Sequence, residues 1–208
     1  MNKHDIELKF YILLRGNLNI QEFEKWVYET DEGMLDEYFG RGFYFELASL
    51  NYKNKYAINE LEKLLFSKIP YGKFEEKRIR EILTSIIEDK GNLVDLFEEL
   101  YGLYCDGYNF LRYLGLVYVF NGMPGEYDTY NFTDQSRLNL KSEAKRILSF
   151  FDEEKIIING ENEYEDFWDE VDKIELHSLE KMYVTSNRNI ISRIIDRVIK
   201  KYKIRKSS

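Results

Sequence analysis

The chain has 208 residues, of which 44% are hydrophobic, 16% aromatic and 33% charged, and its formal net charge is −8. This length and composition are typical of a globular protein with a substantial core and argue against a disordered chain. The negative charge disfavours binding to DNA or RNA, whose phosphate backbones attract lysine and arginine.

Two features concern the compartment in which the protein acts. Cys105 is the single cysteine, so no disulfide can form within one chain, and a reducing compartment is favoured. Residues 1–7 carry charges where a signal peptide would need an apolar run, and the longest apolar stretch, 114–120, is about a third of the ~20 residues of a membrane span. We therefore expect a cytoplasmic protein with no membrane partner.

Apolar residues recur with helical spacing along most of the chain, which predicts amphipathic helices. Asn19 with Glu22, and Asn92 with Asp95, are helix start signals. The predicted helices cover residues 20–27, 58–69, 73–87, 93–101, 143–151 and 190–202. In the helix at 73–87 the isoleucines form the expected buried face, and the expected solvent face holds Glu75, Glu76, Arg78 and Glu81.

Two short stretches rich in β-branched residues, 114–120 and 156–158, each fit either a strand or a buried helical turn, because periodicity does not separate the two at this length. The expected fold class is all-α, a multi-helix bundle or irregular helical array, with a short β element open at either stretch. We expect a single helical domain over 1–208. The glycine-containing loop at 121–128 leaves open two lobes, 1–120 and 130–208.

No residue pattern indicates catalysis or a cofactor. His177 lies between Leu176 and Leu179, a setting typical of a structural histidine, and no glycine-rich phosphate loop is present. The carboxylates of 152–169 lack the alternating order of a calcium loop. We therefore expect no enzyme, no cofactor and no metal site, although paired carboxylates acting as acid and base would leave no local signature.

The most distinctive stretch, Asp152 to Glu175, has eleven carboxylates against two lysines. Such dense charge of one sign repels itself, and a cationic partner explains it most simply. The aromatic residues at 164, 167 and 168 are spaced as one helical stripe, which would either pack into the core or anchor a partner. The predicted partner-binding residues are Glu161, Glu163, Tyr164, Glu165, Asp166, Trp168, Asp169, Glu170 and Asp172.

These carboxylates have an alternative partner within the chain. Residues 181–206 hold nine basic residues against the single acid Asp196. The acidic stretch and a basic carboxyl-terminal helix could therefore pair with each other. The basic run at 200–206 is short and ends an acidic chain, so we interpret it as a helix end and not as a nucleic-acid site.

Residues 10–28 and 45–52 carry a pattern that goes beyond composition. It contains Gly16-Asn17, the Phe-Glu-Lys-Trp-Val-Tyr run at 23–28 and Leu50-Asn51-Tyr52. The pattern resembles small, acidic, helical bacterial proteins of the immunity type, which belong to polymorphic or secreted toxin systems, over roughly the first 85 residues. The resemblance implies a non-enzymatic cytoplasmic inhibitor that covers the active site of one cognate, basic toxin domain. A regulatory or scaffold helical protein is the alternative.

Overall fold

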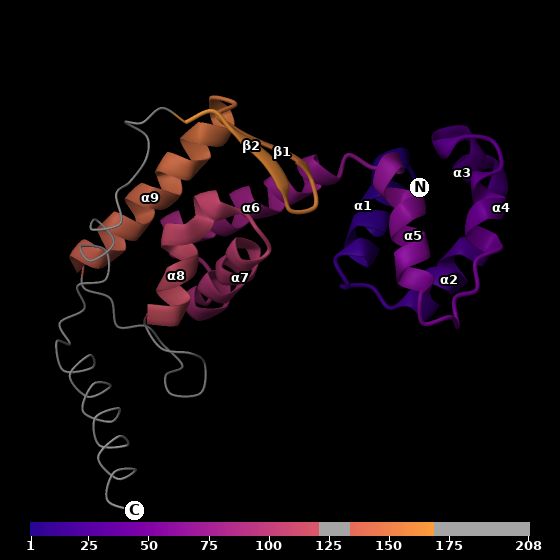
Figure 1. The fold of residues 1–208 in the computed structure, drawn as a ribbon, viewed down its shortest axis with the longest axis horizontal. Coiled ribbons are helices and arrows are strands. Elements are labelled where there is room, and N and C mark those ends of the chain that lie inside the picture. Colours follow the sequence, from indigo (N-terminus) through magenta and orange to yellow (C-terminus); the bar gives the residue numbers. More distant parts are fainter. Residues whose placement is uncertain (121–133, 169–208) are drawn as a thin grey trace, which may run out of the picture. The chain divides into compact units, whose positions relative to one another are not determined.

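A computed structural model describes residues 1–120 and 134–168, which are mainly helical (Figure 1). The mainly α fold class is confirmed. The helices are α1 (Lys3–Leu14), α2 (Ile20–Glu29), α3 (Glu32–Phe39), α4 (Phe43–Ala48), α5 (Ala57–Leu65), α6 (Tyr71–Ile87), α7 (Leu93–Cys105), α8 (Arg112–Phe120) and α9 (Asp134–Asp152). Short 3₁₀ turns lie at Phe66–Lys68 and Asn109–Leu111. Strands β1 (Ile156–Gly160) and β2 (Glu163–Asp166) form a two-stranded sheet.

The helices predicted from periodicity are present wherever the structure describes them, and the helix predicted at 190–202 lies outside the described residues. The two ambiguous stretches have different outcomes. Residues 156–158 belong to β1, whereas 114–120 belong to α8, so the alternative of a strand at 114–120 is wrong. Gly115 lies in the middle of α8, and glycine there offers no branched side chain to a pleated sheet.

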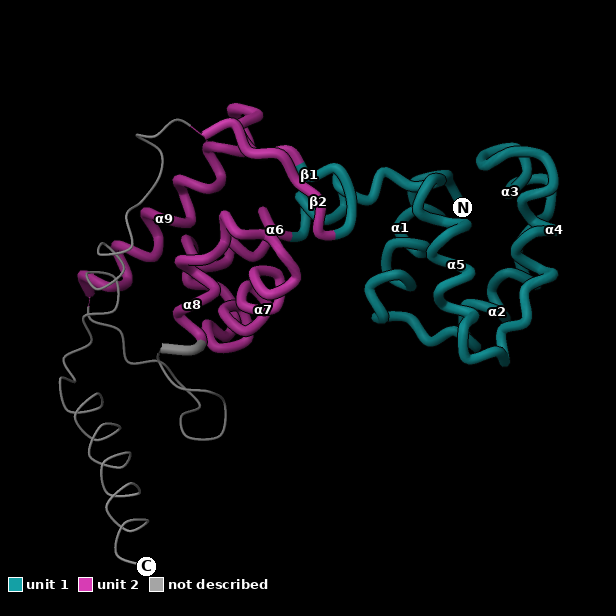
Figure 2. The backbone as a smooth tube through the Cα atoms, in the orientation of Figure 1, with its two compact units in different colours: residues 1–78, 158–161 teal, residues 79–157, 162–208 magenta. Residues whose placement is uncertain are grey.

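The chain divides into two compact units (Figure 2). Unit 1 comprises residues 1–78 with 158–161, and unit 2 comprises residues 79–157 with those from 162 onward. The division falls within α6. The loop at 121–128, which the sequence offered as an alternative boundary, lies outside the described residues.

An aromatic core holds the first helices of unit 1 together. Phe10 of α1 is fully buried, and its ring centroid lies 6.0 Å from Phe23, 5.9 Å from Trp26, 5.3 Å from Phe39 and 6.0 Å from Phe43. Several of these pairs meet edge to face, an arrangement that is favourable because the positive edge of one ring lies against the negative face of the other. One α1 side chain thus contacts α2, α3 and α4.

Side-chain caps fix where the helices of unit 1 begin. The Asn2 side chain accepts from Asp5 N (2.9 Å) while the Asp5 carboxylate accepts from Asn2 N (3.0 Å), so α1 opens with a capping box. Asn19 accepts from Gln21 N at 2.8 Å, which confirms the predicted start of α2. Asp36 accepts from Gly42 N (2.8 Å) and Tyr44 N (3.0 Å), and these bonds position α4.

Unit 2 is built around a close contact between α7 and α8. A side chain at Gly115 would lie 3.0 Å from the Leu100 carbonyl oxygen and 3.1 Å from Tyr104 Cβ, so glycine is what allows this approach. Helix α9 adds a buried face of its own, with Ile147 and Phe151.

Candidate functional site

The predicted binding residues that the structure describes lie on a β-hairpin. The expectation that residues 164, 167 and 168 form one stripe of a helix is therefore wrong. Two local features favour a strand. The isoleucines of β1 are β-branched and suit a sheet, and Asn162 adopts the left-handed conformation (φ 58°) that a tight turn needs. The described predicted residues are Glu161 in the turn, Glu163, Tyr164, Glu165 and Asp166 in β2, and Trp168 just beyond it. Asp169, Glu170 and Asp172 lie outside the described residues.

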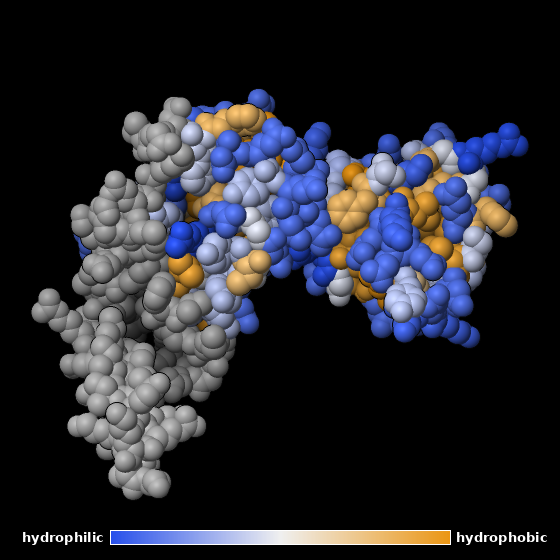
Figure 3. All heavy atoms as spheres, viewed as in Figure 1, coloured by the Kyte–Doolittle hydropathy of each residue, from blue (hydrophilic) through white to orange (hydrophobic). Residues whose placement is uncertain are grey.

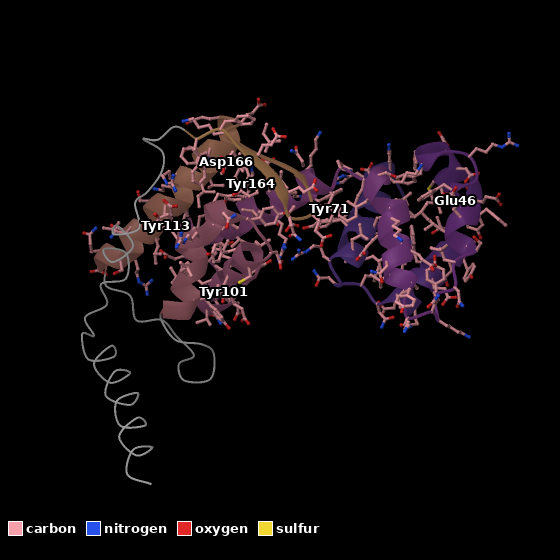
Figure 4. The ribbon with its side chains drawn as sticks, in the orientation of Figure 1. Glu46, Tyr71, Tyr101, Tyr113, Tyr164 and Asp166 are labelled. Carbon is pink, nitrogen blue, oxygen red and sulfur yellow. The ribbon has the colours of Figure 1, made fainter. Side chains whose placement is uncertain are left out.

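The inner side of the hairpin is held by aromatic residues of unit 2. The Tyr108 hydroxyl accepts a hydrogen bond from Asn162 N at 3.1 Å. The Tyr164 ring lies edge-on to Phe110, with centroids 5.1 Å apart, and 6.1 Å from Tyr108. Burial, with the nearby Asp166 carboxylate, raises the pKa of Tyr164. Tyr164 is therefore half-buried and fixed by the packing of unit 2 itself (Figure 4).

Trp168 is fixed in a similar way. Its ring centroid lies 5.3 Å from that of Phe150, and the Arg146 guanidinium lies over the indole at 5.4 Å. Arg146 is itself oriented by two 2.6 Å hydrogen bonds to the buried Glu143 carboxylate. Trp168 is half-buried, and its indole Nε1 is buried with no hydrogen-bond partner among the described residues.

The outer side of the hairpin combines carboxylates with apolar groups. Phe167 N donates to Lys155 O at 2.8 Å, which sets Phe167 opposite Lys155 across the two chain segments. With side chains alternating along each segment, Ile157, Glu163, Glu165 and Phe167 share one face, and all four are exposed. Phe167 is 57% and Ile157 38% exposed. We call these four residues the hairpin face. Glu161 and Asp166 are exposed as well.

Unit 1 contains a buried ionic cluster that the sequence did not predict. Glu75 was expected on the solvent face of its helix, but its side chain is fully buried. Its carboxylate accepts from the Tyr11 hydroxyl (2.5 Å) and from Arg78 Nη1 (3.1 Å), and Arg15 Nη1 lies 3.6 Å away. The Tyr71 hydroxyl and Arg15 Nε are buried and form no hydrogen bond of standard geometry, although the two groups lie close enough to affect each other's pKa. We call these five residues the Glu75 cluster.

The Glu75 cluster has the chemistry of a structural ion network. Two guanidinium groups and one phenol satisfy a carboxylate that burial alone would penalise. Burial and the Glu75 carboxylate raise the pKa of Tyr11 and Tyr71. A raised phenol pKa keeps Tyr11 and Tyr71 protonated near neutral pH, which disfavours both as bases or nucleophiles.

Alkaline pH should destabilise unit 1. Burial, with the charge of Glu75, raises the pKa of Tyr71 from 10.0 to about 12, and burial also raises the pKa of Tyr52. An unfolded tyrosine ionises near pH 10 while the folded one stays protonated. This contribution to stability is therefore complete below pH 10 and is lost as the pH rises toward 12, by roughly 1.4 kcal/mol per pH unit for each such tyrosine.

Urea unfolding at a series of alkaline pH values, together with phenolate absorbance, measures this loss. A Tyr71→Phe variant should show a shallower dependence than the wild type. If all 17 tyrosines of the folded protein ionised together near pH 10, the expectation would be wrong.

No protein-family model, curated protein or solved structure matches the chain. Within residues 1–120 and 134–168, no group of His, Cys, Asp and Glu side chains is arranged to hold a metal ion. None of the helices in that part of the chain has the length and apolar character needed to cross a bilayer.

Proposed function

We propose that this chain is a non-enzymatic inhibitor of the immunity type, which binds and neutralises a basic cognate toxin domain in the cytoplasm. The observation that carries the proposal is the acidic hairpin, residues 161–168. Its Glu161, Glu163, Glu165 and Asp166 side chains are exposed, while its inner side is fixed by Tyr108 and aromatic neighbours. The resemblance of residues 10–52 to immunity-type proteins supports the same reading.

Rigid display of carboxylates suits fast capture of a cationic surface. A potential fixed in space steers a basic partner during diffusion, and a preorganised face loses less conformational entropy on binding. Ile157 and Phe167 lie on the same face as Glu163 and Glu165 and would supply apolar contact once the partner has docked. Tyr164 and Trp168, which pack on unit 2, would hold this face in place while the partner binds.

Charge reversal tests the proposal. The variant Glu163→Lys, Glu165→Lys, Asp166→Lys should bind the toxin domain encoded by the neighbouring gene with an association rate at least about tenfold lower at low salt. Rescue of cells that express the toxin should fail with it. Surface plasmon resonance across a salt series and a survival assay are the two measurements.

A matched control separates local from overall charge. The variant Glu81→Lys, Glu88→Lys, Asp134→Lys changes net charge equally at exposed positions of unit 2 that lie outside the hairpin. It should keep most of the association rate and the rescue. Equal behaviour of the two triple variants would contradict a role for the acidic hairpin.

A further inference from the structure

A second surface, on unit 1, exposes two aromatic side chains. Phe45 is 72% exposed and Tyr28 54% exposed. In α4 the buried residues are Phe43 and Leu47, and at about 100° per residue Phe45 points away from both. Phe45 therefore contributes its ring to the surface and not to the core. Figure 3 shows apolar side chains at the surface of this unit among hydrophilic ones.

The two rings belong to one surface because a hydrogen bond joins α2 to the end of α4. The Tyr28 hydroxyl donates to Ala48 O at 3.3 Å, and Ala48 lies one helical turn from Phe45 on the same side of α4. The Tyr52 hydroxyl donates to Leu47 O at 2.9 Å. Burial raises the pKa of Tyr52 most, and Tyr28 and Glu24 raise it further, so these two groups lie near the same helix end.

The segment that carries these rings has an excess of carboxylates. Residues 20–55 contain eight carboxylates against Lys25, Arg41, Lys53 and Lys55. Glu46 follows Phe45 on α4 and is exposed (Figure 4). Glu24 is half-buried on α2, and the last carbonyls of α4 add partial negative charge. An aromatic face with carboxylates beside it attracts cations twice, through the ring quadrupole and through charge.

We propose that Glu24, Tyr28, Phe45 and Glu46, the α2–α4 surface, dock a cationic protein segment, with arginine side chains stacking on the two rings and pairing with the two carboxylates. Symmetric pairing of two copies through this same surface does not fit, because it would bring carboxylates against carboxylates. A purely apolar partner would leave Glu24 and Glu46 without counter-charge as they lose water. The proposal concerns unit 1 and does not rest on the function proposed for the hairpin.

An arginine-containing peptide probes this surface directly. We would titrate an acetylated, amidated peptide of alternating arginine and leucine into isotopically labelled protein and follow amide chemical shifts. The expected result is that the largest shifts fall on α2 and α4, and that Phe45→Ser with Tyr28→Ser weakens binding at least about fivefold. The same peptide with citrulline replacing arginine should bind much more weakly, because citrulline keeps the shape without the charge.

Two control variants locate the effect. Tyr56→Ser removes a similarly exposed aromatic ring elsewhere in unit 1 and should leave the affinity unchanged. The hairpin triple variant should also keep the shifts on α2 and α4, even if its own partner binding is lost. The proposal is overturned if the Phe45 and Tyr28 changes leave the affinity intact, if citrulline binds as well as arginine, or if the shifts avoid α2 and α4.

Discussion

Replacing Glu75 with glutamine should lower the free energy of unfolding of unit 1 by about 2 to 3 kcal/mol. Glutamine keeps the size of the side chain and can still accept from the Tyr11 hydroxyl, so the change isolates the charge. Arg15 and Arg78 would then lie beside a neutral group. Their side chains are 18% and 22% exposed, so water can solvate the two guanidinium groups and replace part of the lost interaction free energy. The expected effect is therefore smaller than for a fully buried ion pair.

The two tryptophans make this measurement specific to a unit. Trp26 belongs to unit 1 and Trp168 to unit 2. In a Trp168→Phe background, urea unfolding followed by fluorescence therefore reports on unit 1. The control Glu37→Gln removes an exposed carboxylate of unit 1, in α3, and should change stability by less than about 0.5 kcal/mol.

A compensating change makes the test stricter. Arg15→Met keeps the apolar stem of the side chain and removes its charge, so in the Glu75→Gln background it should recover part of the lost stability. If Glu75→Gln alone were as stable as Glu37→Gln, the Glu75 cluster would not be an ion network that stabilises unit 1.

Glu75 also shows which features of α6 can be predicted from the sequence and which cannot. Helical spacing correctly predicted α6 and its isoleucine face, but it placed Glu75 in water because the residue lies on the polar side of that helix. Its burial depends on Tyr11 of α1 and on Arg15, which follows that helix, about 60 positions earlier in the chain, and a local pattern does not contain that contact. The position of a charged residue on the polar side of one helix therefore does not show whether it is buried against a partner from another helix.

Helices α1, α3 and α4 were not predicted from the sequence, because local spacing carries too little information in each of them. In α1, residues 10–14 are almost continuously apolar, so they show no stripe that separates a buried from an exposed face. Helices α3 and α4 are eight and six residues long, too short for periodicity to accumulate. They are specified instead by the Asp31 cap of α3, by hydrogen bonds from the start of α4 to Asp36, and by contacts with the Phe10 ring.

The candidate site was predicted in its charge but not in its conformation. The density of carboxylates after residue 160 was evident in the sequence, and the described ones are exposed. The strand at 163–166 was not evident, because the spacing of Tyr164, Phe167 and Trp168 also fits a helix. Tyr108 and Phe110, which receive Tyr164, are more than 50 positions away and decide between the two conformations.

Replacing Gly72 with alanine should destabilise the contact between the start of α6 and β1. A side chain at this position would lie 1.9 Å from the Ile158 carbonyl oxygen and 2.7 Å from its carbonyl carbon. These are backbone atoms, so no rotation of a flexible side chain can make room, and β1 would have to move. We expect a loss of about 2 kcal/mol, after allowing for the roughly 1 kcal/mol that alanine contributes inside a helix.

Gly102→Ala is the matched control, because Gly102 lies in α7 with open space around its Cα. That variant should be as stable as the wild type or more stable by up to about 1 kcal/mol. Hydrogen exchange separates the two outcomes: in Gly72→Ala the amides of β1 and β2 should exchange faster, while those of α7 and α8 keep their protection. Because β1 supports β2, the same variant should weaken partner capture by the acidic hairpin although every carboxylate is retained. Unchanged exchange in β1 would contradict the close packing of its backbone on α6.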